Sequence, residues 1–170
     1  ADVVITEFMA DNDSTLADED GDYSDWIELY NSGTDSVDLA GWYLADDLSV
    51  LSHWRFPALV LEPGEFVVVF ASGKDRAIAG NELHTNFSLA TGGEYLALVG
   101  SDGITPLSGF SPEYPEQVHG VSYGTGSATN PVTESQTLVT WPADARWLIP
   151  AADIGDSWQL NGFDDSNWTA

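Results

Sequence analysis

The sequence predicts an all-β protein, folded as an antiparallel β-sandwich. Short segments with strand character recur every 8 to 15 residues. Gly, Pro, Asn and Asp gather between them, as expected for strands joined by turns. Only residues 74–82 have the composition of a helical turn or two, and a loop fits them as well. At 170 residues, with seven tryptophans and no cysteine, the chain is long enough to build a core without disulfides.

The strands can be predicted in order along the chain. In residues 26–30, Ile27 and Leu29 fall on one side while polar or aromatic side chains fall on the other, which indicates one buried face. The apolar run 66–70 has no such alternation, so we expect it to be buried on both faces. The full set of predicted strands comprises residues 3–9, 26–30, 37–39, 42–44, 52–56, 66–70, 85–89, 95–99, a segment from 104 onward, and 118–123.

The composition changes near residue 125, which predicts a domain boundary. We expect a β-sandwich domain over residues 1–125 and a linker over 126–136, because the linker segment is rich in Gly, Ser, Thr, Asn and Pro. Residues 137–170 hold four of the seven tryptophans but are too few to form a core alone. This partly irregular C-terminal extension either packs back on the sandwich or is the truncated start of a second β domain, and we predict the second.

The chain is strongly acidic, with 28 acidic residues, 4 basic residues and a net charge of -24. Such a charge repels phosphate, so we expect no nucleic-acid partner and no anionic membrane surface. No apolar run is long enough to cross a bilayer, so membrane insertion is not expected either. Two interpretations of the charge are compatible: a surface adapted to a saline environment, or a protein that binds divalent cations through carboxylates.

One acidic loop is the candidate cation site. Residues 18–25 contain five acidic side chains around Gly21, and calcium prefers several carboxylate ligands on a loop that can fold around it. An EF-hand register fails, because Leu16 and Ile27 would occupy its anchoring positions. A looser calcium site remains, alongside the alternative of a solvated loop. Its candidate ligands are Asp18, Asp20, Asp22 and Asp25, and Asp11 or Asp13 are further candidates.

Catalytic motifs are weak. Residues 120–124 match G-x-S-x-G, but that motif requires a strand-to-helix turn and a histidine later in the chain, and the sequence indicates neither. His53, His84 and His119 lie on separate segments without the spacing of a zinc site. We therefore predict no catalytic residues, no enzymatic activity and no certain cofactor, with calcium as the one candidate. Trp26, Trp42 and Trp54 lie at strand positions and are predicted to belong to the core.

Residues 3–125 resemble the lamin tail domain in the form found in large exported bacterial proteins. The matching segments are 4–10 (VITEFMA), 25–31 (DWIELYN), 37–44 (VDLAGWYL), 54–57 (WRFP), 61–66 (LEPGEF), 84–89 (HTNFSL), 93–98 (GEYLAL) and 122–124 (SYG). The resemblance implies an immunoglobulin-like antiparallel β-sandwich without catalytic residues. Residues 158–168 (WQLNGFDDSNW) are similar to the opening of galactose-binding-like domains.

The resemblance sets the functional expectation. It implies a non-catalytic structural, adhesion or recognition module of a larger exported protein, located outside the cell or at its surface. The alternative is a calcium-stabilised module that binds carbohydrates or surfaces and is attached to a secreted hydrolase. Expected partners are neighbouring domains of the same chain and protein or glycan ligands at the cell surface. The start of the chain carries no export signal, and no heptad rod precedes the domain, so nuclear filament partners are not expected.

Overall fold

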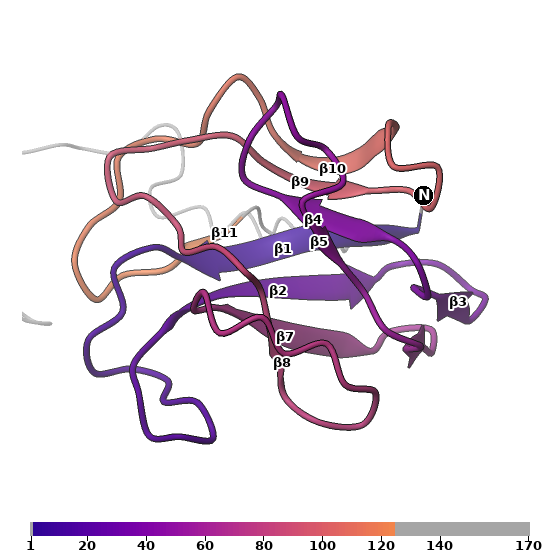
Figure 1. The fold of residues 1–170 in the computed structure, drawn as a ribbon, viewed down its shortest axis with the longest axis horizontal. Helices are drawn as coiled ribbons and strands as arrows, with labels where there is room; N and C mark the ends of the chain where they lie inside the picture. The colour runs from indigo at the N-terminus through magenta and orange to yellow at the C-terminus, as the bar shows by residue number, and fades with distance from the viewer. Residues whose placement is uncertain (1, 125–170) are drawn as a thin grey trace, which may run out of the picture. The chain divides into compact units, whose positions relative to one another are not determined.

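The computed structural model describes residues 2–124, and over this range the protein is all-β and contains no helix (Figure 1). The strands pair antiparallel except for β7 and β8, which confirms the predicted immunoglobulin-like antiparallel β-sandwich. The expected linker 126–136 and C-terminal extension 137–170 lie outside the described residues. Among the described residues, no helix is long and apolar enough to span a membrane.

The larger sheet has five strands in the order β11-β1-β2-β7-β8. Strand β1 pairs antiparallel with β2 and with β11, β2 pairs antiparallel with β7, and β8 runs parallel to β7. The bounds are β1 Val3–Met9, β2 Asp25–Asn31, β7 Phe66–Ala71, β8 Leu83–His84 and β11 Tyr123–Gly124.

The second layer is a four-stranded sheet in the order β10-β9-β4-β5, drawn above the first in Figure 1. A separate two-stranded sheet joins β3 and β6. The bounds are β3 Val37–Asp38, β4 Tyr43–Ala45, β5 Trp54–Arg55, β6 Val60–Leu61, β9 Leu96–Val99 and β10 Pro106–Phe110.

The main core lies between the two sheets. Ile27 and Leu29 of β2 are fully buried there, as their alternation predicts. The predicted core positions of two tryptophans are confirmed, because Trp26 is 9% exposed and Trp54 is 2% exposed. Trp42 is only partly buried and packs against the edge of the same core. A direct link between the sheets is the hydrogen bond that the Ile5 amide donates to Ser108 Oγ at 3.0 Å.

The expectation that residues 66–70 are buried on both faces is wrong for the first half of β7. Phe66 is 51% exposed, whereas Val69 and Phe70 are buried. Val69 points into the main core, while Phe70 is covered on the outer face by Met9 and Trp26. The outer face of the sheet is thus covered only toward the end of β7, and Phe66 instead stacks on Tyr30, with ring centroids 4.2 Å apart.

Two predicted strands differ in detail, and residues 74–82 adopt the loop alternative. Residues 85–89 keep alternating burial but form no strand, because their backbone groups bond to scattered partners such as Phe70 and Gly73. Regular strand pairing is found instead just before this segment, at β8, which pairs with β7. Residues 74–82 form a loop, and of the predicted strand 118–123 only the last residue is paired, in β11.

Candidate functional site

The acidic loop between β1 and β2 folds around the carboxylate of Asp18. This side chain is buried and accepts hydrogen bonds from the amides of Asp20 at 3.0 Å and Asp22 at 3.1 Å, and from the Ser24 hydroxyl at 2.9 Å. Gly21 has a φ of 85°, a conformation that a glycine adopts without strain. A short-range network therefore fixes the loop, although it is rich in like charges.

A lysine occupies the centre of this loop. Lys74 Nζ lies 2.7 Å from Asp18 Oδ2, 2.8 Å from Asp20 Oδ2 and 2.9 Å from Asp22 Oδ2. Lys74 is the single lysine of the chain and comes from the loop that follows β7. Three of the four predicted calcium ligands therefore converge on one point, and in this structure an ammonium group lies there.

The ion pairs in this network shift the pKa values of Asp18 and Lys74 in opposite directions. Burial alone would raise the pKa of Asp18, but the hydrogen bonds from Lys74, Ser24 and the two amides outweigh it and lower the pKa to about 2. Burial alone would lower the pKa of Lys74, and its three carboxylate partners instead raise it above its usual value. Both groups are thus charged at neutral pH, and the loop is tied to the β7–β8 connection by ion pairs.

The fourth predicted ligand, Asp25, stands apart from the other three. It begins β2 and accepts a hydrogen bond from the Leu89 amide at 3.1 Å. Burial, together with the nearby charges of Asp11 and Glu94, raises the pKa of Asp25 to about 6, despite the hydrogen bonds that favour its ionised form. Through the Leu89 amide, Asp25 links β2 to the segment before β9. It does not belong to the cluster of Asp18, Asp20 and Asp22 around Lys74.

We predict that Asp25→Asn stabilises the protein at pH 7 by about 1–2 kcal/mol. The folded state holds the Asp25 proton up to about pH 6, whereas the unfolded chain releases it near pH 4. Stability is therefore lost as the pH rises from about 4 to 6, and asparagine avoids this loss. Urea unfolding at pH 4 and pH 7 checks the prediction.

The exposed Asp35→Asn serves as the matched control, because it removes the same charge from a solvated site. An equal gain for both variants, or a gain for Asp25→Asn that persists at pH 4, would contradict this account.

The remaining motifs are held in structural contacts. Ser122 donates a hydrogen bond to Glu7, and the serine precedes the edge strand β11 rather than a helix, so no nucleophile elbow exists there. His119 Nδ1 lies 3.2 Å from Asp11 Oδ1 and His119 Nε2 lies 2.8 Å from Asp13 Oδ2, and neither aspartate belongs to the cluster of Asp18, Asp20 and Asp22. His53 Nδ1 lies 2.5 Å from Asp46 Oδ1.

Sequence reasoning missed a second cluster, formed by Glu19, Glu82 and His84. Glu82 and His84 are two residues apart, at the start of β8, so an extended backbone places their side chains on one side. That spacing was the available signal. Glu19 comes from the acidic loop, more than sixty residues earlier in the chain, and sequence spacing alone gave no reason to join it to the pair.

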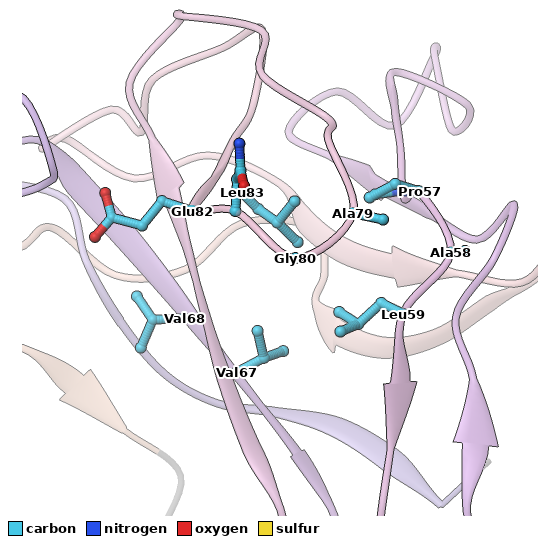
Figure 2. Close-up of a pocket in the computed structure, with 10 residues that line it drawn as sticks. Pro57, Ala58, Leu59, Val67, Val68, Ala79, Gly80, Glu82 and Leu83 are labelled. Carbon is cyan, nitrogen blue, oxygen red and sulfur yellow. The ribbon is translucent and has the colours of Figure 1, made fainter.

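An apolar hollow of about 260 Å³ opens near the same edge of the sheet (Figure 2). Its main lining residues are Pro57, Leu59, Val67, Val68, Ala79 and Leu83, with Glu82 at the rim. Figure 2 shows the Glu82 side chain extending away from Pro57 and Leu59. The hollow therefore offers apolar surface beside β8. Glu82 lines this hollow and also belongs to the cluster with Glu19 and His84.

Comparison with known proteins places this fold. A family model described as Lamin Tail Domain matches residues 1–110. A search of curated proteins returned no match. The family is immunoglobulin-like and generally non-catalytic, which agrees with the sandwich and with the structural contacts of the motif residues. Since the match covers well over half of the 170 residues, the chain belongs to the lamin tail domain family.

Proposed function

We propose that the protein is a structural, adhesion or recognition module of a larger exported protein, acting outside the cell or at its surface. The observation that carries this proposal is the core: the two sheets enclose one buried cluster whose members run from Val3 to Tyr114. A domain with its own core can hold neighbouring domains in place without depending on them. The net charge of -24 favours a well-hydrated protein and disfavours anionic partners.

The apolar hollow beside β8 is the feature that favours recognition over a purely spacing role. It combines apolar walls with polar groups at the rim, as sites for small ligands and protein side chains do. Protein or glycan ligands at the cell surface are the partners we propose for it.

Binding of the full 170-residue chain to a glycan array and to immobilised cell-surface proteins tests this proposal. Ala79→Arg introduces a long charged side chain at the hollow, while Ala77→Arg places the same change on the same loop at a residue that does not line it. We expect binding to be lost in the first variant and kept in the second. Equal binding by both would show that the hollow is not the site, and no binding at all would favour the spacer role.

A second candidate function is calcium-dependent stabilisation, favoured by the convergence of Asp18, Asp20 and Asp22. Their carboxylate oxygens lie within 4.8 Å of one another, a spacing that suits shared ligation of a calcium ion. Lys74 competes with such an ion, because its ammonium group contacts all three carboxylates. Calcium would have to displace this group.

We predict that Lys74→Met tightens calcium binding by at least about tenfold, which corresponds to about 1.4 kcal/mol. The substitution removes the competing charge while leaving all three carboxylates in place. Calorimetric titration of the wild-type protein and the variant with calcium measures the effect. Arg55→Met is the control, since it removes a positive charge from an exposed strand position outside the cluster. If neither the wild-type protein nor Lys74→Met binds calcium, this second function is ruled out.

A further inference from the structure

His84 is a buried histidine with one unsatisfied ring nitrogen. Its side chain has no exposed surface, and its Nε2 atom has no hydrogen-bond partner. One face of the ring stacks on Phe70, with ring centroids 5.5 Å apart. Buried polar atoms are nearly always paired, so an unpaired imidazole nitrogen indicates a missing partner.

The unpaired nitrogen faces a carboxylate. His84 Nε2 lies 3.7 Å from Glu82 Oε2, which is too far for a hydrogen bond. Two ligands of a tetrahedral zinc ion, each bonded at about 2.0–2.1 Å, lie about 3.4 Å apart. The gap between the two atoms is therefore close to the separation that a shared metal ion requires.

Glu19 completes a set of three ligands. Its carboxylate oxygen, Glu82 and His84 Nε2 all lie within 4.8 Å of one another. The Glu19 amide also donates a hydrogen bond of 2.6 Å to Glu82 Oε2, which holds the acidic loop against the start of β8. The carboxylates of Glu19 and Glu82 remain partly exposed. Glu19 Oε1 also lies 2.9 Å from Arg76 Nη1, so a bound ion would compete with this ion pair.

The opposite side of the histidine ring is already positioned. His84 Nδ1 lies 2.9 Å from Ser72 Oγ. When Nδ1 donates its proton to this hydroxyl, Nε2 is left with a free lone pair directed at Glu82. Metal-binding histidines in proteins are commonly oriented in this way by a hydrogen bond at the other nitrogen.

The local charge favours a further cation. Five carboxylates gather here, from Asp18, Glu19, Asp20, Asp22 and Glu82, and the first four are in contact with two basic side chains, Lys74 and Arg76. The five carboxylates and two basic side chains together carry a net charge of -3, and Glu82 contacts neither Lys74 nor Arg76. A divalent ion would reduce this excess.

We propose that Glu19, Glu82 and His84 form a binding site for a divalent transition-metal ion, for which zinc is the probe. One imidazole nitrogen with two carboxylates suits ions of this class, whereas calcium and magnesium prefer oxygen ligands throughout. The three side chains leave one position of a tetrahedral ion for water. The bound ion would join the acidic β1–β2 loop to the edge strand β8.

Zinc titration of the metal-free 170-residue chain tests the site. We expect binding with one ion per chain in calorimetry, retained in the presence of excess magnesium. Glu82→Gln and His84→Gln should each weaken zinc binding by at least about tenfold. His119→Gln is the matched control, because His119 also contacts two carboxylates. It should bind zinc as the wild-type protein does.

Nitrogen NMR of the histidine rings gives a second readout that needs no substitution in the core. Zinc should shift the Nε2 resonance of His84 and leave its Nδ1 protonated. If His84→Gln fails to fold, Glu82→Gln and the NMR spectrum still decide the question. Zinc binding that is lost in His119→Gln but kept in Glu82→Gln, a His84 spectrum unchanged by zinc, or no zinc binding at all would each overturn the proposal.

Discussion

Phe8→Ala is expected to lower the free energy of unfolding by about 4 kcal/mol. Phe8 is fully buried on β1, and its ring packs against Phe110, Tyr114 and Tyr123, with centroid distances of 5.2, 4.5 and 5.6 Å. Truncation leaves a cavity and also removes three aromatic contacts that join β1 to β10, to β11 and to the segment between them. Chemical denaturation monitored by tryptophan fluorescence measures the loss.

Phe66→Ala is the matched control for Phe8→Ala. Phe66 is 51% exposed and has one aromatic neighbour, Tyr30, so its truncation should cost about 1 kcal/mol. Comparable losses for the two phenylalanines would mean that the aromatic cluster around Phe8 does not organise the core.

Lys74→Met is expected to lower the free energy of unfolding by about 3 kcal/mol. The substitution leaves the fully buried carboxylate of Asp18 without its cation and exposes Asp20 and Asp22 to mutual repulsion. An uncompensated buried charge is costly, whereas the exposed members of the cluster contribute little. Thermal unfolding in calcium-free buffer measures the effect.

Arg55→Met is again the control for Lys74→Met, because it produces the same change in net charge at an exposed position and should cost less than about 0.5 kcal/mol. Adding Asp18→Asn to Lys74→Met should recover part of the loss, since the buried charge is then removed as well. If the double variant is no more stable than Lys74→Met, the pairing between Asp18 and Lys74 is not the source of the stability.

Local sequence patterns were sufficient for most of the sandwich. The alternation around Ile27 and Leu29 and the strand position of Trp54 predicted the burial of these residues, because period-two patterns report directly on which face meets the core. The pattern misled at Phe66, since an apolar run does not reveal where the covering layer ends. At residues 85–89 the burial alternates as in a strand, but the backbone groups bond to scattered partners instead of to one neighbouring strand.

The candidate sites separate what the sequence determines from what only the tertiary structure determines. The sequence alone determines the sandwich class, the strong negative charge and the acidic loop, because composition and short-range spacing carry that information. Only the tertiary structure places Lys74 at the centre of Asp18, Asp20 and Asp22, moves Asp25 away from them, and brings Glu19 to His84. These contacts join residues more than fifty positions apart, and the packing of β7 and β8 beside β2 decides which of those distant side chains meet.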